Sequence, residues 1–197
     1  SGSPTVRNCT VIGNSAVYGG AAGAQMSSPR FANCLFINNN STDAGGAICQ
    51  LSGPSGTMRF ANCEFINNAS AGHGGGLYAG GPTDLANCVF NDNTSTEGAG
   101  AIYMSEFGQS FSITNCTLTK NYSALSTGGV YFDAGNLLVS NSILWGNTSG
   151  PGAGLTLKQQ QLWALSGAVA QVNLSCVQTQ EANPWPGLKN IKLDPQF

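Results

Sequence analysis

A seven-residue word recurs along the chain and constrains its fold more than any other feature. The word reads Asn-Cys-x-apolar-x-x-Asn, and its leading residue returns at steps of 25, 29, 25, 28 and 26 residues. The leading positions are Asn8, Asn33, Asn62, Asn87, Asn115 and Asn141. A glycine-rich word lies between successive copies, as at Gly45–Ile48 and Gly74–Leu77. A fixed period of this length is the signature of a solenoid, in which each repeat packs only on its neighbours.

The apolar stretches of the repeat are typical of strands rather than of helices. They are short, rich in β-branched and aromatic residues, and bounded by glycine and asparagine. We therefore predict an all-β fold, a parallel β-helix of about six coils of 25–29 residues with three short strands each. Residues 1–150 would form the coils, and residues 151–197 an irregular C-terminal capping or continuation segment of the same domain. Within this segment, residues 158–172 have the spacing of a short amphipathic helix or a packing strand.

The composition agrees with stacked coils. Charged residues make up 8% of the chain, and its 20 asparagines outnumber the nine acidic and seven basic residues together. Because equivalent positions stack, a repeated charge would face a like charge, whereas neutral asparagines can form amide ladders. The net charge of −2 gives no electrostatic argument for a nucleic-acid partner, and no apolar run approaches the ~20 residues that span a bilayer. We expect neither nucleic-acid binding nor membrane insertion.

Three columns of the repeat are predicted to be structural. The asparagine column is a partly buried ladder of Asn8, Asn33, Asn62, Asn87 and Asn115. The aromatic column of the interior contains Phe36, Phe65 and Phe90. Apart from the structural columns, a polar column that includes Asp92 and Lys120 is expected to lie on the surface, where these two side chains would form an ion pair between neighbouring coils.

The third structural column consists of cysteines. Five of the seven cysteines occupy it: Cys9, Cys34, Cys63, Cys88 and Cys116. Ser142 takes this position in the sixth repeat, so small size matters there more than a covalent bond. Zinc sites need paired ligands a few residues apart, and these residues are at least 25 apart. Two interpretations stay open, namely buried thiols that act as small apolar residues and disulfides between adjacent coils about 4.8 Å apart.

Asn-x-Ser/Thr sequons are frequent, as expected by chance in a chain rich in these residues. If the source glycosylates proteins, the turn after the aromatic strand would carry a row of glycans along one edge of the rod. The candidate glycosylation sites are Asn39, Asn40, Asn68, Asn93, Asn121 and Asn147.

Residues with catalytic or ligand-binding chemistry are sparse. His73 precedes a glycine-rich turn, and no neighbour in sequence orients it as a general base. The nine acidic residues are spread singly, although stacking of coils can bring distant carboxylates together. Tyr78, Tyr103 and Phe132 follow the glycine-rich words and form either core or an outward aromatic strip that stacks on sugars. We predict no catalytic residue, cofactor site or metal site.

The repeat words resemble those of known bacterial proteins. Gly-Gly-Ala-Ile alternating with Phe-x-x-Asn resembles the repeats of the chlamydial polymorphic outer-membrane proteins. Over about residues 4–147 the chain also resembles right-handed β-helix surface proteins of the pectin-lyase-like superfamily. The words near Asn141, Ser175 and Asp194 resemble the end of "choice-of-anchor Q" β-helix proteins. These resemblances imply a right-handed coil and export to an extracellular or cell-surface location.

Our functional hypothesis is a non-catalytic structural or adhesive protein of the cell surface or of the secreted fraction. The expected partners are a second copy stacked end to end into a filament, or neighbouring β-helix domains of the same chain, and carbohydrate is a further candidate ligand. The alternative hypothesis is a polysaccharide-binding or polysaccharide-degrading lyase or hydrolase, because enzymes of the pectin-lyase-like superfamily share the predicted fold.

Overall fold

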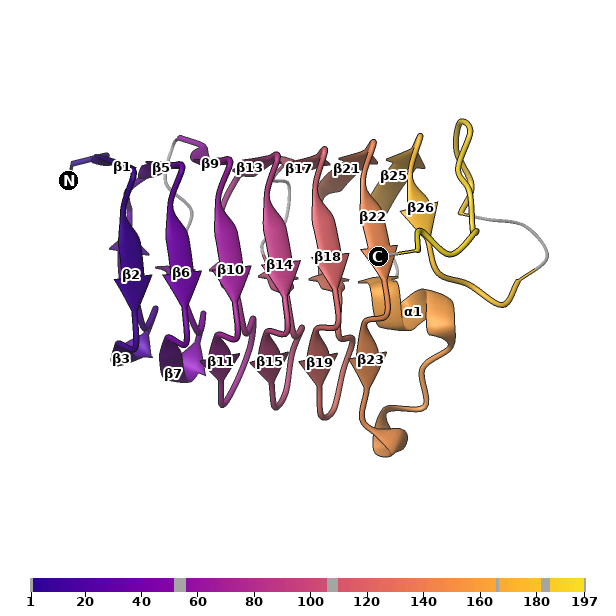
Figure 1. Ribbon diagram of the computed structural model, residues 1–197, viewed down its shortest axis with the longest axis horizontal. Helices are drawn as coiled ribbons and strands as arrows, with labels where there is room; N and C mark the ends of the chain where they lie inside the picture. The colour runs from indigo at the N-terminus through magenta and orange to yellow at the C-terminus, as the bar shows by residue number, and fades with distance from the viewer. Residues whose placement is uncertain (1, 52–55, 106–109, 166, 182–184, 197) are drawn as a thin grey trace.

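The chain folds into a rod of stacked parallel coils. The computed structural model describes residues 2–51, 56–105, 110–165, 167–181 and 185–196. Four parallel sheets run along the rod and contain seven, seven, six and six strands (Figure 1). Within each sheet every strand pairs with its equivalents one coil before and one coil after, as the repeat predicts. The predicted all-β parallel β-helix is therefore confirmed.

Each sheet is built from the equivalent strands of successive coils. Sheet A contains β1 (Thr5–Arg7), β5 (Arg30–Ala32), β9 (Met58–Ala61), β13 (Thr83–Ala86), β17 (Ser110–Thr114), β21 (Asn136–Ser140) and β25 (Val169–Asn173). Sheet B contains β2 (Thr10–Ile12), β6 (Leu35–Ile37), β10 (Glu64–Ile66), β14 (Val89–Asn91), β18 (Thr117–Thr119), β22 (Ile143–Trp145) and β26 (Cys176–Val177). Sheet C contains β3 (Ser15–Tyr18), β7 (Asn40–Ala44), β11 (Ala69–Ser70), β15 (Thr94–Ser95), β19 (Tyr122–Ser123) and β23 (Thr148–Ser149). Sheet D contains β4 (Ala22–Gln25), β8 (Ile48–Leu51), β12 (Leu77–Ala79), β16 (Ile102–Met104), β20 (Val130–Phe132) and β24 (Leu162–Ala164).

Each coil has four strands rather than the predicted three. The additional strand belongs to sheet C, where most strands have only two residues and, apart from Tyr122, their side chains are serine, threonine or alanine. Such a short polar strand leaves no alternation of apolar residues in the sequence, so the pattern does not reveal it. Six coils contribute one strand to each of the four sheets, and β25 and β26 begin a seventh.

The core fills the inside of the rod with stacked aromatic and aliphatic side chains. Phe36, Phe65 and Phe90 lie in register on neighbouring strands of sheet B, with ring centroids 4.9 and 4.3 Å apart. All three are buried, which confirms the predicted aromatic column. On sheet A, Phe31 stacks on Phe60 at 5.1 Å. Burial of each large side chain contributes about 2–3 kcal/mol to folding.

The predicted asparagine ladder forms at the corner between sheets A and B. Each side chain donates to the next across the coils, for example Asn62 Nδ2 to Asn33 Oδ1 at 3.0 Å. Its members have φ of 49–54°, in the left-handed region that asparagine tolerates better than other non-glycine residues. Asparagine thus serves both the turn and the ladder. The ladder is exposed to solvent, whereas the sequence predicted partial burial.

A second left-handed corner lies between sheets B and C. Asp92 and Lys120 occupy it with φ of 54° and 56°. Their predicted ion pair is wrong, because among the described residues Asp92 accepts a hydrogen bond from its own neighbour Asn91 instead. The Asp92 carboxylate therefore bonds within its own coil rather than to Lys120 of the next coil.

The glycine-rich words mark where neighbouring coils approach most closely. A Cβ added to Gly75 would lie 2.2 Å from the carbonyl oxygen of Thr94 in the next coil. At Gly46 the corresponding distance, to the oxygen of Gly75, is 2.1 Å. Only glycine permits such backbone contact.

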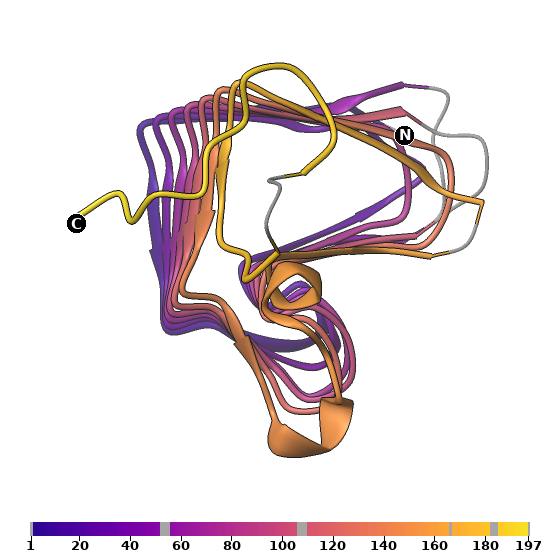
Figure 2. The ribbon, with the colours of Figure 1, turned by 90° about the vertical axis from the view of Figure 1, so that its right-hand side faces the viewer.

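The C-terminal segment continues the coils and then crosses the end of the rod. The 3₁₀ helix η1 (Pro151–Ala153) and the short helix α1 (Leu157–Gln161) precede β24, and a capping box at Thr156 starts α1. The prediction for residues 158–172 is met by helix and strands together. Leu174 and Lys189 again have left-handed backbone and are only 15 residues apart, so the last coil is shorter than the repeats of 25–29 residues. Figure 2 shows this tail beside the coil ends, and Trp185 packs against the core.

Candidate functional site

An aromatic column runs along the outer face of sheet D. The strand register aligns Tyr78, Tyr103, Tyr131 and Trp163. Phe132 does not belong to this column, although the sequence aligns it with Tyr78 and Tyr103. It pairs with Met104 and is fully buried, which agrees for this residue with the core alternative. The member of the column in that coil is Tyr131, and the sequence marks it as the aromatic residue directly after Val130, the apolar residue that ends the glycine-rich word.

The rings of this column stack on one another. Tyr103 lies 5.4 Å from Tyr78 and 4.8 Å from Tyr131, with interplanar angles of 5° and 9°. Trp163 ends the column edge-on to Tyr131. Burial, followed by the nearby Asp133 carboxylate, raises the pKa of Tyr103. Because the faces of the central rings contact each other, the column is a structural ladder and offers mainly ring edges to a sugar.

His73 lies beside this column rather than in a catalytic arrangement. Its ring lies 4.7 Å from that of Tyr103 at a tilt of 35°, and its Nε2 atom is 3.6 Å from Glu97 Oε2. The Nδ1 atom is buried without a hydrogen-bond partner among the described residues. With Nδ1 buried and Nε2 facing the Glu97 carboxylate, the imidazole is not placed as a general base for a substrate.

The acidic residues that stacking was considered able to gather lie on different faces. Glu64 is on the outer face of sheet B, Asp84 is on that of sheet A, and Asp92 is at a corner. Among the described residues, no group of three or more His, Cys, Asp or Glu side chains is arranged to hold a metal ion.

A second, fully buried asparagine ladder runs along the rod between sheets B and C. Its members are Asn39, Asn68, Asn93, Asn121 and Asn147. Each amide donates to the next asparagine and to a carbonyl inside the rod, as Asn68 Nδ2 does to Asn93 Oδ1 and to Phe36 O, both at 3.0 Å. Gln161 of α1 accepts from Asn147 Nδ2 at 2.8 Å and ends the ladder.

This ladder overturns most of the predicted glycosylation sites. An amide nitrogen that is 0% exposed and donates two hydrogen bonds cannot carry a glycan in the folded chain. Of the six predicted asparagines, Asn40 is exposed and stays a candidate. The sequons are therefore a by-product of a ladder asparagine followed by the small polar residues of sheet C.

The cysteine column consists of free thiols. Cys34, Cys63, Cys88 and Cys116 are buried and Cys9 is exposed. The Sγ atom of each donates to the carbonyl two residues earlier, for example Cys88 to Ala86 O at 3.3 Å. A hydrogen bond from Cys88 lowers the pKa of Cys63 to about 7, whereas burial raises that of Cys34. The seven cysteines form no disulfide, which agrees with the interpretation as small buried side chains.

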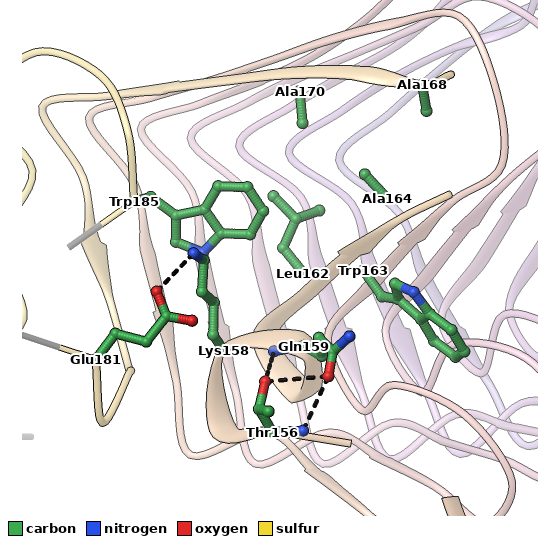
Figure 3. Close-up of a pocket in the computed structure, with 10 residues that line it drawn as sticks. All are labelled: Thr156, Lys158, Gln159, Leu162, Trp163, Ala164, Ala168, Ala170, Glu181 and Trp185. Atoms are coloured by element: carbon green, nitrogen blue, oxygen red, sulfur yellow. Dashed lines mark hydrogen bonds and ion pairs between the residues drawn. The ribbon is translucent and has the colours of Figure 1, made fainter. Parts of the chain in front are cut away.

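A pocket of about 470 Å³ opens at the C-terminal end of the rod (Figure 3). It lies beside β24, the last strand of sheet D, and Leu162 and Ala164 of this strand form part of its apolar wall. On its rim Lys158 Nζ donates to Glu181 Oε2 at 2.8 Å and sits 4.8 Å from the centroid of the Trp185 ring. Lys158 and Glu181 are paired with each other, and the other described lining residues include no acid or base, so the pocket is an unfilled end of the rod interior.

Comparison with known proteins agrees with this geometry. The profile of the right-handed β-helix region matches residues 53–174, more than half of the chain. The chain belongs to the right-handed β-helix family. The second match to this β-helix is the repeat of the Chlamydia polymorphic membrane proteins, which covers residues 33–50. That stretch contains one asparagine-cysteine word and the glycine-rich word that follows it.

The two matches confirm the resemblance to right-handed β-helix proteins and to the chlamydial repeats, whereas the assignment to the pectin-lyase-like superfamily stays a prediction. No curated protein and no solved structure matches this β-helix chain. The resemblance of its C-terminal words to "choice-of-anchor Q" proteins stays a prediction. In the described ranges, none of the helices has the length and apolar character that crossing a bilayer requires.

Proposed function

We propose that this β-helix is a non-catalytic rod of the cell surface or of the secreted fraction, with a structural or adhesive role. The observation that carries the proposal is the match of residues 33–50 to a repeat of Chlamydia polymorphic membrane proteins, within a rod of uniform coils. A membrane-protein repeat of this kind supports a place at the outer surface.

The distribution of reactive groups supports a role without catalysis. Glu64 and Asp84 lie on separate faces, His73 has one ring nitrogen buried and the other facing Glu97, and Lys158 and Glu181 form an ion pair. A polysaccharide-degrading enzyme of this fold would need clustered acids or a cation site beside a base. The alternative that the rod degrades polysaccharides therefore has less support than the adhesive role.

Two experiments test these statements. Intact cells of the source organism should lose the protein to an added protease, and protection of the protein in intact cells would contradict a surface location. The purified chain, incubated with uronate polymers with and without calcium, should release no unsaturated products. Accumulation of such products would establish a lyase and refute the non-catalytic proposal.

The ends of the rod support the further proposal of end-to-end association. Strands β1 to β4 each leave one edge without a partner among the described strands, and the apolar side chains of Ile12, Val17 and Met26 beside them are 57, 55 and 68% exposed. At the other end, β23 and β24 pair with no further described strand, although α1 packs beside them, while residues 188 and 191 bond to the ends of β25 and β26. A second copy would thus meet sheets C and D, because unpaired parallel edges are templates for another strand.

Analytical ultracentrifugation and electron microscopy of the purified chain test this association. Short filaments or concentration-dependent oligomers are expected. The double substitution Ile12→Lys/Val17→Lys should weaken association, whereas Leu125→Lys, at an exposed position away from the ends, should not. A wild-type chain that stays monomeric at high concentration would refute end-to-end stacking.

A further inference from the structure

All three arginines of the chain lie together on the outer face of sheet A. They are Arg7 in β1, Arg30 in β5 and Arg59 in β9, separated by 23 and 29 residues in sequence. The register pairs Arg30 directly with Arg59, and Arg7 with Ala32 on the strand of Arg30. The coils therefore bring the three guanidinium groups onto three consecutive strands, about 4.8 Å apart from strand to strand.

This cluster is electrostatically unfavourable by itself. Like charges directly opposite each other in a sheet are destabilising, and the chain otherwise carries few charges. One carboxylate offsets them, since Arg59 Nε donates to Asp84 Oδ2 at 3.2 Å and Ser112 holds the other oxygen at 2.7 Å. The side chains of Arg7 and Arg30 make no hydrogen bond or ion pair with the residues that the structure describes. Three guanidinium groups and one carboxylate leave a local charge of +2 on a chain of net charge −2.

A shallow neutral strip borders the arginines. Ala32, Ala61 and Ala86 are paired in register on the same outer face, two residues beyond the column of Arg30 and Arg59. Directly after these alanines comes the exposed asparagine ladder, whose amides face solvent. The face thus presents guanidinium groups, a floor of small side chains and a row of amides, all repeated along the rod axis.

We propose that this face binds the sulfate esters of an extended sulfated glycan. Arginine donates from a planar fork and pairs strongly with multi-oxygen anions, and a tetrahedral sulfate can accept from two guanidinium groups at once. The face is open, so a free sulfate ion would stay hydrated and bind weakly, whereas a polymer engages several charges together. The repeat of the strip along the axis matches an extended chain. This inference names the ligand for the adhesive role and rests on that proposed function.

The test measures binding of the purified full chain to dextran sulfate by biolayer interferometry. Uncharged dextran, polygalacturonate and inorganic sulfate are the comparison ligands. The double variant Arg30→Gln/Arg59→Gln should bind dextran sulfate about 100-fold more weakly, at about tenfold for each charged hydrogen-bonding group. The control Lys120→Gln/Lys189→Gln removes the same charge elsewhere and should change binding less than about threefold.

Several results would overturn the inference. Equal losses in both double variants would indicate non-specific attraction, and polygalacturonate binding as tight as that of dextran sulfate would refute the preference for sulfate. Absence of binding to dextran sulfate at low salt would refute the site itself, while the protease experiment on cells separately tests the surface role. Thermal melting checks that the arginine variant is folded. We expect it to melt close to wild type, because the variant loses both a like-charge contact and the exposed Arg59–Asp84 ion pair, and each effect is about 1 kcal/mol or less.

Discussion

Replacing Asn93 by alanine should destabilise the rod more than any exposed substitution of the same kind. The Asn93 side chain is 0% exposed. Its Nδ2 atom donates to Asn121 Oδ1 and to Phe65 O, both at 2.9 Å. Its Oδ1 atom accepts from the backbone and side-chain nitrogens of Asn68, both at 3.0 Å. Four hydrogen bonds in a dry interior therefore depend on one amide.

The magnitude follows from the groups that alanine would leave without partners. The backbone N–H of Asn68 and one of its amide hydrogens would lose their acceptor, and Phe65 O would lose a donor. A buried polar group without a partner costs about 1–3 kcal/mol, so the expected loss is about 3–5 kcal/mol. For a chain of this size such a loss lowers the melting temperature by roughly 6–20 °C.

The matched control is Asn87→Ala in the exposed ladder. Asn87 Nδ2 donates to Asn62 Oδ1 at 3.0 Å, but water replaces this bond when the side chain is removed. The left-handed backbone of Asn87, with φ of 54°, adds about 1 kcal/mol for alanine. Urea unfolding followed by circular dichroism compares the two variants. Losses that agree within 1 kcal/mol would refute the argument that the inner ladder stabilises the fold.

Four further predictions concern the core, the turns and the thiols. Phe65→Ala removes a ring stacked at 4.3 Å on its neighbour and should cost about 3–5 kcal/mol in urea unfolding; a loss below 1 kcal/mol would contradict the stacked core. Gly75→Ala should abolish soluble expression, because its Cβ would lie 2.2 Å from a backbone oxygen, and a variant with wild-type melting would contradict that contact. A thiol reagent should label Cys9 rapidly in the native chain and all seven cysteines in denaturant, whereas several fast native thiols would contradict their burial. Burial, with the Asp43 carboxylate, raises the pKa of Cys49 from 9.0 to about 12. Between about pH 9 and 12 only the unfolded state releases this proton, so the folded chain should lose stability as the pH rises through this range. In Cys49→Ala this loss should be smaller by up to about 4 kcal/mol.

The sequence predicts the fold because stacking repeats its signals. The period, the interior apolar column that contains Phe36, Phe65 and Phe90, and the asparagine column recur from coil to coil, so a weak local word becomes a strong one. The strands of sheet C escape prediction because two-residue strands such as Thr94–Ser95 have no apolar alternation. The register of Phe132 fails for a related reason, since a shift of one residue moves a side chain from one face to the other.

Burial of polar residues is the second limit of the sequence. Asn93 and Asn40 carry similar sequons, yet one is buried in a ladder and the other is exposed. Asparagine is usually a surface residue, so its type alone predicts exposure. What decides the outcome is whether the next coil offers an amide at hydrogen-bond distance, which only the register of the coils determines. The arginine face depends on the same register, because residues far apart in sequence meet on adjacent strands.

Spin-label distances along one outward column test the central claim of in-register parallel coils most directly. Nitroxide pairs that join Thr10 to Val89, Thr117 or Ile143 span three, four and five strand spacings of sheet B. At about 4.8 Å per coil the expected mean separations are about 14, 19 and 24 Å, although the residues are far apart in sequence. Double electron–electron resonance, with continuous-wave broadening for the shortest pair, measures them. Separations that fail to rise in equal steps of about 5 Å would contradict the stacked β-helix.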